Sequence, residues 1–577
     1  MKVKLAKTAG FCMGVRRALE MVLSEANRNQ GTIYTYGPLI HNQQVMDLLA
    51  TKKVEVFEPG HGIEQGTLFI RAHGIPPQER KRLKASGLNV MDATCPRVAR
   101  VQALIRYHTG KGYTAVIVGD RDHAEVIGLK GHGNGKAHVV GNVNDVDQLP
   151  EAEKVIVVAQ TTQEKQAFDA VVAAVKRRFP DALVFDTICD ATRDRQDEVR
   201  ALAPHVDAIV VVGGYHSGNT RRLAQVAQST GLPVFHVETA EELDKERLAS
   251  MEVIGVTAGA STPNWMIRKV VQEIETLRSR KEGRLGRWIW HVFKFLFQSN
   301  LVVASGAFSL CHAGTTLSGR QPDLLHPTLA FLYVYAMHVM NRLLDKGAST
   351  YNDPERAHFY TTYRLPLALS GVVSMGAALL LAGTLGLKSL LAMAGLLLIG
   401  SIYSLPIVPL SRRHLWRYTK IKDIPGSKTL SQALAWGAVI ALLPLLELST
   451  SVWAPSIIAF LFVFSVVYVR SALFDIFQVQ GDLIVGVETL PLTLGERRTL
   501  FLLRGVILGG AVILAASALF GITSSFSYLL LLCYVTLTLS LLAYEKQWLH
   551  AGTSLEALVE GNLFLAGLLG LVWLWLK

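Results

Sequence analysis

Residues 1–280 repeat one pattern, in which a short apolar run rich in β-branched residues is followed by a loop of glycine and polar residues. The clearest examples are TAVIVGD, KVIVVAQTT, AIVVVGGYHSGNT and VIGVTAGAS. Stretches of helical character separate these runs, and this alternation predicts parallel sheets with helices on both faces. Ligands of such sheets bind in the loops beyond the carboxyl ends of the strands. We therefore expect an α/β half whose site residues lie in these loops.

The pattern changes from about Trp290, where apolar stretches approach the ~20 residues that cross a bilayer as a helix. The sequence predicts an all-α polytopic membrane domain with nine transmembrane helices. Their expected centres lie roughly near residues 305, 333, 375, 398, 438, 463, 511, 533 and 567.

The composition agrees with two domains of different character. Of the 577 residues, 50% are hydrophobic, and the mean hydropathy is +0.30, which is more than a soluble protein of this length usually shows. The predicted domains are 1–280 and 294–577, joined by a basic linker at 281–293. The boundary segment LRSRKEGRLGR fits two readings equally well: a linker lying against anionic headgroups, or a solvated charged helix end.

The charge points to membrane topology rather than to nucleic acid. The net charge is +12, but no basic patch with interleaved aromatic residues occurs, so no nucleic-acid partner is expected. With a cytoplasmic N-terminus, most basic residues of the membrane half fall in cytoplasmic loops, and the opposite loops hold little beyond Arg320 and Lys388. The start, MKVKLAKTAGFCMGV, does not resemble a secretory signal. We expect a multi-pass protein of the cell inner membrane with a cytoplasmic N-terminal domain.

Three of the five cysteines, Cys12, Cys95 and Cys189, lie in the α/β half, each in a short segment ahead of a predicted helix. Thiolates near helix N-termini are stabilised and bind soft metals well. The spacing suggests three related modules around one shared centre, although buried structural cysteines explain these residues, taken alone, equally well. The sequence has no CxxC pair, which counts against a zinc ribbon or a dithiol redox motif. Cys311 and Cys533 lie inside apolar spans and are expected to be packing residues.

The cysteine segments belong to a longer series of motifs over about residues 1–278. In order, these are GFCMGVRRA, GPLIHN, RAHG followed by PP, DATCP, DHAE, QTT, DTICDATRDRQ, HSGN and GVTAGAS. The series resembles the 4-hydroxy-3-methylbut-2-enyl diphosphate reductase (IspH/LytB) family. Several motifs in register are far more specific than any one of them. The resemblance implies three related α/β modules around a central 4Fe-4S cluster.

The resemblance also implies a role for each matching residue. Cys12, Cys95 and Cys189 would be the cluster ligands, with a fourth iron open to the substrate hydroxyl. Glu125 would be the proton donor. The residues expected to bind the diphosphate and hydroxyl oxygens are His41, His73, His123, Thr161 or Thr162, Ser217, Gly218 through its N–H, Asn219 and Ser261. Gly218 stands where the family usually has serine, so we expect a weaker grip on substrate rather than loss of reaction.

The implied reaction is the two-electron reductive dehydroxylation of 4-hydroxy-3-methylbut-2-enyl diphosphate to isopentenyl and dimethylallyl diphosphates. An external electron donor of the ferredoxin or flavodoxin type is expected, because the sequence shows no nicotinamide or flavin site. The rival interpretation of this half is a non-catalytic iron-sulfur sensor. The presence of Glu125 and of all three histidines favours the enzyme.

Two loops of the membrane half carry acids and amides beside apolar spans, NRLLDKGASTYNDPER and DIFQVQGDLIVGVETLP. Such acids are often only interfacial. Two loops together suggest a cage for Mg²⁺ ions that bridge a diphosphate, since hard cations prefer carboxylate oxygens. About residues 295–577 resemble the UbiA family of membrane prenyltransferases, which has nine helices and two aspartate-rich motifs. Asn341 and Asp345 match the first motif, and Asp475 and Asp482 match the second.

This second resemblance implies Mg²⁺-dependent transfer of a prenyl group to an unidentified acceptor within membrane lipid. Ser349 and Gln478 stand at commonly acidic positions, so the cage holds fewer carboxylates than is typical. Lys420 and Lys422 fit phosphate ligands and ordinary cytoplasmic-loop residues equally well. The alternative is a catalytically inactive membrane anchor that tethers the reductase. Fusion of a diphosphate producer to a diphosphate consumer suggests metabolic coupling.

Overall fold

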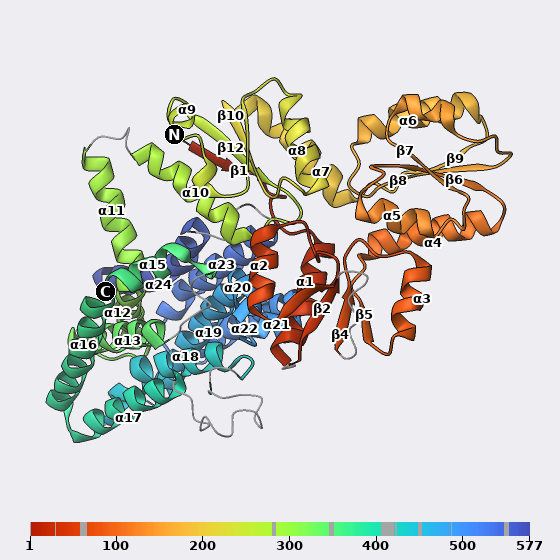
Figure 1. Cartoon of the computed structure of the whole chain (residues 1–577). Helices are drawn as coiled ribbons and strands as arrows, with labels where there is room; N and C mark the ends of the chain where they lie inside the picture. The colour runs from red at the N-terminus through yellow and green to blue at the C-terminus, as the bar shows by residue number, and fades with distance from the viewer. Residues whose placement is uncertain are drawn as a thin grey trace. The chain divides into compact units, whose positions relative to one another are not determined.

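The structure is a computed structural model of the chain. It describes residues 2–28, 31–57, 66–279, 284–344, 351–404, 421, 424–447, 453–485, 487–546, 548 and 553–576. The chain divides into two compact units, Met1–Gly283 and Arg284–Lys577 (Figure 1).

Three parallel four-stranded sheets form the first unit, which confirms the predicted α/β modules. The first sheet has the order β1 (Lys2–Leu5), β12 (Val253–Ala258), β10 (Ala208–Val212), β11 (Val234–Val237). The second has the order β3 (Val54–Phe57), β2 (Ile33–Tyr36), β4 (Thr67–Ile70), β5 (Asn89–Asp92). The third has the order β7 (Ala137–Val140), β6 (Thr114–Val118), β8 (Val155–Ala159), β9 (Leu183–Phe185).

Helices connect the strands and cover the sheets (Figure 1). Every residue of β8 and of β10 is buried, as expected for parallel strands covered on both faces, and this explains their continuous apolar runs. Short 3₁₀ turns η1 (Val143–Gln148), η2 (Ala203–His205) and η3 (Ala240–Glu242) complete the connections. The helices are α1 (Met13–Arg28), α2 (Gln43–Thr51), α3 (Pro77–Ala85), α4 (Pro96–Gly110), α5 (Ala124–Gly131), α6 (Lys165–Arg178), α7 (Asp190–Leu202), α8 (Gly218–Gln228), α9 (Lys245–Ala249) and α10 (Asn264–Ser279).

The described residues of the second unit are helical. A π-helical turn, η6 (Ala438–Leu442), and a 3₁₀ turn, η7 (Leu443–Leu446), continue α18. The α-helices are α11 (Arg284–Gln298), α12 (Leu301–Leu317), α13 (Leu325–Leu344), α15 (Pro354–Thr362), α16 (Arg364–Leu385), α17 (Leu387–Ser404), α18 (Ser427–Gly437), α19 (Trp453–Phe477), α20 (Val479–Val485), α21 (Leu490–Leu494), α22 (Glu496–Leu519), α23 (Phe526–Glu545) and α24 (Thr553–Leu576).

In the described part of the chain, six helices are long and apolar enough to cross a membrane. They are α16, α18 with its continuation, α19, α22, α23 and α24. The other three expected centres, near residues 305, 333 and 398, fall on α12, α13 and α17, which do not meet both criteria. Cys311 and Cys533 are buried in the apolar core of this unit, as predicted for packing residues.

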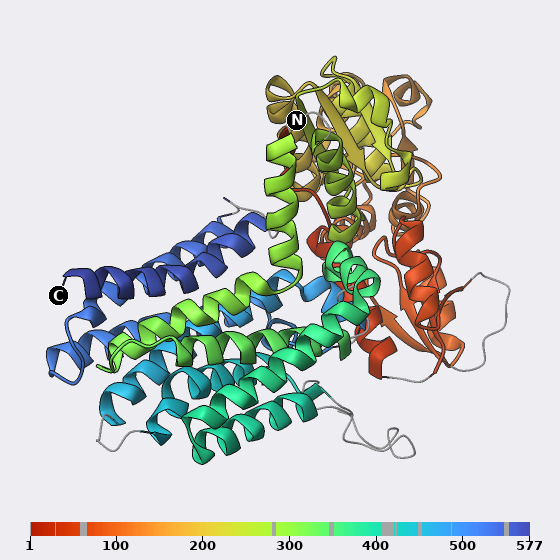
Figure 2. The ribbon, with the colours of Figure 1, turned by 90° about the vertical axis from the view of Figure 1, so that its left-hand side faces the viewer.

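The long helices of the second unit pack in succession (Figure 2). Helix α12 contacts α13, α13 contacts α16, α16 contacts α17, and α17 contacts η7 at the end of α18. Helix α18 contacts α19, α19 contacts α22, α22 contacts α23, α23 contacts α24, and α24 returns to α12. The helices therefore form a closed bundle. Its predicted cytoplasmic end holds the C-termini of α13 and α19 and the N-termini of α18 and α24.

The predicted linker, 281–293, overlaps helix α11. Leu285, Trp288 and Ile289 of this helix are exposed, whereas Lys294 forms an ion pair with Glu355 at 2.7 Å. The segment is thus helical over most of its length, with apolar side chains facing outward.

Candidate functional sites

The topology of the three sheets explains where the predicted site residues of the α/β unit lie. Cys12, Cys95 and Cys189 follow β1, β5 and β9, which are edge strands, one in each sheet. The predicted substrate-binding residues and Glu125 follow the two central strands of each sheet. The carboxyl ends of parallel strands are the usual place for a ligand. Each module therefore offers one thiol and two polar loops.

The polar loops and the thiols meet at one cavity of about 100 Å³. All thirteen predicted residues of this unit line it. They are Cys12, His41, His73, Cys95, His123, Glu125, Thr161, Thr162, Cys189, Ser217, Gly218, Asn219 and Ser261.

The three thiols face a common space. A Cβ at Gly14 would lie 2.5 Å from Cys95 Sγ and 4.0 Å from Cys12 Sγ, so a larger residue there would fill the gap between the thiols. None of the three cysteines is in a disulfide. Burial raises the pKa of the Cys95 and Cys189 thiols, and backbone N–H groups that open α4 and α7 oppose this shift. Three convergent thiols with N–H donors fit a cluster that takes three protein ligands.

Three histidines line the opposite part of the cavity wall. The ring centroids of His41 and His73 are 4.9 Å apart, and the His123 ring lies 5.7 and 5.3 Å from them. Burial, and to a lesser extent neighbouring imidazoles and Arg71, lowers the pKa of His41 and His73, and burial lowers the pKa of His123 to about 4. All three are therefore neutral at pH 7.

The donors of this wall are aimed at the cavity. The Glu125 backbone N–H donates to His123 Nδ1 at 3.1 Å, which leaves the ring proton on Nε2. His41 Nε2, His73 Nδ1 and Asn219 Nδ2 are buried without a hydrogen-bond partner among the described residues. Buried polar atoms without hydrogen-bond partners lower the stability of the fold. This arrangement therefore fits a binding site whose ligand supplies hydrogen-bond acceptors.

Glu125 is buried at the start of α5, with 1% of its surface exposed. Its two carboxylate oxygens accept from the backbone N–H and the hydroxyl of Thr161, at 2.7 and 2.8 Å. Burial raises the pKa of Glu125, while the bonds from Thr161 and the charge of Arg222 oppose the shift. A carboxyl group of raised pKa beside a cavity suits a proton donor.

Ser217, Asn219 and Ser261 close the cavity at the first turn of α8 and the loop after β12. Ser261 Oγ donates to Ser217 Oγ at 3.3 Å, and Ser217 Oγ accepts from the Thr220 N–H at 3.4 Å as the helix cap. Gly218 lies against the His123 ring, because a Cβ there would be 3.4 Å from Nε2. The glycine thus leaves the Nε2–H of His123 open.

Two arginines near the cavity were not identified from the sequence: Arg195, which is buried, and Arg222, which is partly buried. Arg222 of α8 pairs with Asp120 at 2.8 Å and donates to the Thr162 carbonyl at 3.1 Å, so it joins the loops after β6 and β8. Arg195 of α7 donates to the Gly10 carbonyl at 2.6 Å and lies near Cys12. Helical spacing could have identified such residues in the sequence. Arg222, for example, lies one helical turn after the predicted site residue Asn219.

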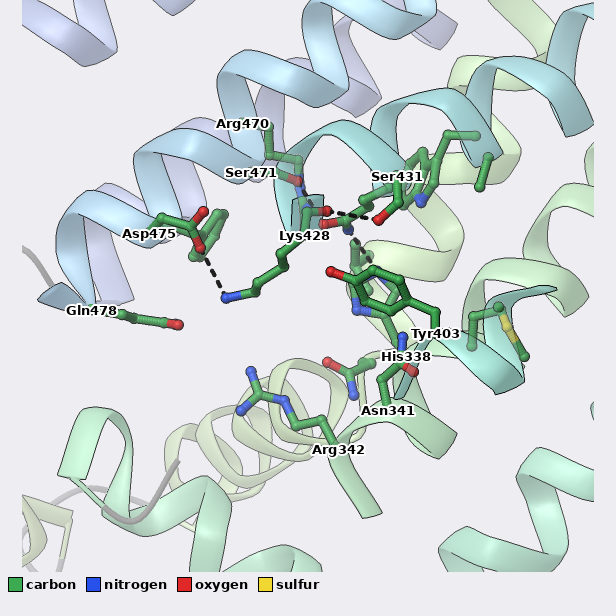
Figure 3. Close-up of a pocket in the computed structure, with 18 of the residues that line it drawn as sticks. His338, Asn341, Arg342, Tyr403, Lys428, Ser431, Arg470, Ser471, Asp475 and Gln478 are labelled. Atoms are coloured by element: carbon green, nitrogen blue, oxygen red, sulfur yellow. Dashed lines mark hydrogen bonds and ion pairs between the residues drawn. The ribbon is translucent and has the colours of Figure 1, made fainter. Parts of the chain in front are cut away.

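The helical unit has a larger cavity, of about 300 Å³ (Figure 3). Of the predicted metal ligands, Asn341, Asp475 and Asp482 line it, whereas Asp345 lies outside the described residues, as do Ser349, Lys420 and Lys422. Charged residues that sequence reasoning did not place in it also line the cavity: Arg342, Lys428, Arg470, Glu556 and Glu560. Arg356, from the NDPER segment, lines it as well.

The two acids of the second motif have protein partners. Asp475 Oδ1 accepts from Lys428 Nζ at 2.8 Å, and Oδ2 accepts from Thr429 Oγ1 at 2.7 Å. Asp482 Oδ1 accepts from Asn352 Nδ2 at 3.0 Å. Gly481 allows this close approach, since a Cβ there would lie 2.1 Å from Asn352 Oδ1.

The remaining acids of the cavity are held by arginines. Arg470 forms a bidentate pair with Glu560, with one bond at 3.0 Å from Nε, and its guanidinium lies 5.7 Å from the Trp436 ring centroid. Arg356 lies 3.2 Å from Asp353 and 3.8 Å from Glu556. These acids and arginines of the cavity wall therefore form ion pairs with residues of the same unit.

Comparisons with known proteins divide the chain at the same place. Residues 3–275 match the family model described as LytB protein, and residues 302–568 match the UbiA prenyltransferase family. The 4-hydroxy-3-methylbut-2-enyl diphosphate reductase of Opitutus terrae is 43% identical over 289 residues, which cover 48% of this chain and 100% of that protein. The reductase of Geobacter sulfurreducens is 44% identical over 283 residues, which cover 49% and 100%.

Two solved structures each align with part of the chain. A diphosphate reductase from Plasmodium falciparum aligns with a TM-score of 0.46 and 31% identity, over 47% of this chain and 87% of that one. A UbiA homolog from Archaeoglobus fulgidus, bound to GPP and Mg²⁺, aligns with a TM-score of 0.36 and 19% identity, over 48% and 97%.

Proposed function

Because the chain belongs to the LytB family over residues 3–275 and carries a UbiA prenyltransferase family domain over residues 302–568, we propose that it is a bifunctional isoprenoid enzyme. The α/β unit reductively dehydroxylates 4-hydroxy-3-methylbut-2-enyl diphosphate to isopentenyl and dimethylallyl diphosphates. Two electrons and two protons enter, the carbon–oxygen bond of the allylic alcohol breaks, and water leaves. The reductase name of the curated relatives supports this assignment.

Cys12, Cys95 and Cys189 hold a 4Fe-4S cluster in this proposal. The cluster supplies single electrons and an iron without a protein ligand, which can accept the substrate hydroxyl. A ferredoxin or flavodoxin-type partner provides the electrons. The three thiols line one cavity, and two of them, those of Cys12 and Cys95, lie beside Gly14, which supports the ligand assignment.

The chain's own polar residues bind the diphosphate and move the proton. The Nε2–H of His123 and the unpaired donors of His41, His73 and Asn219 face the phosphate oxygens, with Ser217, Ser261 and the Gly218 N–H beside them. Glu125, oriented by Thr161, delivers a proton to the departing hydroxyl, and Thr162 lines the same wall. One observation carries the proposal: three thiols, three imidazoles and a buried carboxyl share one cavity.

Anaerobic purification of the full chain with cluster reconstitution tests this function. With a reduced viologen as electron source, we expect about four irons per chain and conversion of the substrate to both products. Cys95→Ser should lose iron and activity together, whereas Cys311→Ser, the same change in the helical unit, should keep both. Full activity in Cys95→Ser would refute the site.

The helical unit, we propose, transfers a prenyl group from a diphosphate to an acceptor that its residues do not identify. The cavity of about 300 Å³ with cationic side chains and acids supports a diphosphate site. Asn341, Asn352 and Asp482 offer oxygen donors for one Mg²⁺, which would assist loss of diphosphate. Asp475 fits a metal less well, because Lys428 already pairs with it.

The second candidate for this unit is an inactive anchor that tethers the reductase in the membrane. The internal ion pairs favour it, because acids bound to lysine and arginine are poor metal ligands. One experiment distinguishes the transferase from the inactive anchor: membranes are incubated with Mg²⁺ and labelled prenyl diphosphates of several lengths. Label in a lipid extract supports transfer, and none at any chain length supports the anchor.

We also propose that the chain resides in the cell inner membrane with residues 1–280 in the cytoplasm and 294–577 crossing the membrane nine times. The basic residues Arg342, Arg356, Arg497 and Arg498 support this orientation by the positive-inside rule. The exposed apolar side chains of α11 support the reading in which the segment at 281–293 lies against headgroups.

A further inference from the structure

We propose that the ammonium group of Lys428 replaces one divalent cation in the cavity of the helical unit. A prenyl diphosphate would then be held by Lys428 and Arg342 together with no more than one Mg²⁺. This inference rests on the proposed prenyl transfer and adds the phosphate ligands and the metal count.

The first support is the environment of Asp475, the acid that opens the second motif. Only 1% of its surface is exposed, and both of its oxygens are engaged, by Lys428 Nζ at 2.8 Å and by Thr429 Oγ1 at 2.7 Å. A Mg²⁺ ion on this carboxylate would lie at about 2.1 Å from an oxygen and thus close to the ammonium. Repulsion between the two cations in a buried site disfavours that arrangement.

The second support is the placement of the ammonium itself. The Lys428 side chain is 44% exposed, whereas that of Asp475 is 2% exposed, so the lysine reaches from the wall into the cavity. Figure 3 shows it extending toward Asp475, with Gln478, Asn341 and Arg342 around the same space. An ammonium carries three N–H donors and can bridge a carboxylate and a phosphate oxygen, as a metal ion does.

The third support is the charge of the cavity wall. Its described residues include four basic side chains, Arg342, Arg356, Lys428 and Arg470, and four acidic ones, Asp475, Asp482, Glu556 and Glu560. A site for two divalent ions needs an excess of acids. A balanced wall suits a diphosphate with one ion.

Arg342 and Asp482 are the further ligands of this proposal, for phosphate and for Mg²⁺ respectively. Arg342 forms no ion pair with a carboxylate among the described residues, whereas Arg470 is committed to Glu560. A guanidinium binds two phosphate oxygens at once. Asp482, near the Asn352 and Gln478 amides, is the acid best placed for the single Mg²⁺.

The test uses the full chain in lipid nanodiscs with a non-hydrolysable twenty-carbon prenyl thiolodiphosphate. The cavity of the helical unit, at about 300 Å³, is larger than that of the α/β unit, at about 100 Å³, so we expect this long-chain analogue to bind in the helical unit. Equilibrium dialysis with radioactive Mn²⁺ counts the metal bound with the analogue. We expect one Mn²⁺ per analogue and measurable binding in EDTA.

Lys428→Met keeps the side-chain length and removes the charge. We expect analogue binding in EDTA to weaken by about 10- to 100-fold, the effect of one charge-assisted hydrogen bond, and a second Mn²⁺ to enter at Asp475. Lys388→Met, which removes an exposed lysine of α17, is the control and should change neither quantity. The metal count of the unaltered chain stands even if Lys428→Met does not fold.

Two outcomes overturn the inference in distinguishable ways. Two Mn²⁺ per analogue in the unaltered chain, with no effect of Lys428→Met, refutes the lysine's role and leaves prenyl transfer intact. No binding of the analogue at any Mn²⁺ concentration refutes the diphosphate site, and with it both proposals.

Discussion

The two cavities of this chain are proposed to bind the same class of ligand, yet they are built differently. The cavity of the α/β unit presents neutral imidazoles and buried donors without partners among the described residues. In the helical cavity Asp475 and Glu560 are already bound to lysine and arginine side chains. The first wall therefore lacks hydrogen-bond partners that a ligand would supply, whereas two acids of the second wall are already neutralised by internal ion pairs.

Because of this difference, the cavity of the α/β unit indicates ligand binding more directly than the cavity of the helical unit does. Unpaired buried donors lower the free energy of unfolding. They are expected mainly where a bound ligand pairs with them. Internal ion pairs serve stability and binding alike, so they do not distinguish an enzyme from an anchor.

Glu125→Gln should reduce kcat of the reductase by about 10³-fold, because a positioned acid contributes about 10²- to 10⁴-fold. Glutamine keeps a similar shape beside Thr161 but cannot deliver the proton. Iron content and substrate affinity should stay within about threefold, which steady-state kinetics and iron analysis measure. Glu153→Gln, at an exposed acid of the same unit, should behave as the unaltered chain. An unchanged kcat in Glu125→Gln would show that Glu125 is not the proton donor.

Arg470→Met should destabilise the helical unit by about 3–5 kcal/mol, because it leaves the buried Glu560 carboxylate without its partner. The double change Arg470→Met with Glu560→Met should recover most of this loss. Thermal unfolding in detergent measures both. Arg504→Met, which breaks an exposed pair with Glu545, should cost about 1 kcal/mol or less. Equal effects at the two sites would contradict the buried pair's importance.

The proton donor and the histidines should give pH dependences of the same sign in two different quantities, kcat and substrate affinity. Since the pKa of Glu125 is raised, kcat should stay constant at acidic pH and fall as the pH rises through that value. The imidazoles are neutral when the cavity is empty, because burial lowers their pKa. A bound diphosphate favours their protonation, so substrate affinity should increase as the pH falls from about 8 to 6. A kcat that rises with pH in this range would speak against Glu125 as the acid.

Gly218→Ser should have the smallest effect. The added Cβ lies 3.3 Å from the His123 ring, so the ring must shift by a few tenths of an ångström, while the new hydroxyl offers a further donor to phosphate. We expect KM to change by less than about tenfold and kcat by less than about threefold, since both changes are worth about 1 kcal/mol. Loss of activity would show that the glycine is required rather than tolerated.

The sequence predicted most of the α/β cavity because its residues occur in local segments. Each cysteine directly precedes a helix, and each polar loop follows an apolar strand such as β8 or β10, so a short window contains the signal. What such windows do not contain is the strand order. The rule that edge strands carry thiols and central strands carry ligand-binding loops emerges only from the paired sheets.

The helical cavity was less predictable because its contacts join distant residues. Lys428 and Asp475 are 47 positions apart, and Arg470 and Glu560 are 90 apart. Hydropathy reports the length of a helix in a membrane but not which face meets which neighbour. The sequence therefore predicts a metal site from the acids alone, because it does not show which basic side chains pair with them.

If this chain holds two separate isoprenoid diphosphate sites, a change in one site should leave the other intact. Glu125→Gln and Asp482→Asn are prepared in the full chain, and each is assayed for reductase turnover and for binding of the twenty-carbon thiolodiphosphate. We predict a crossed pattern: Glu125→Gln loses turnover and keeps binding of the analogue, and Asp482→Asn loses Mn²⁺-supported binding and keeps turnover. A single variant that abolishes both activities while the chain stays folded, or analogue binding that survives Asp482→Asn unchanged, would contradict the account.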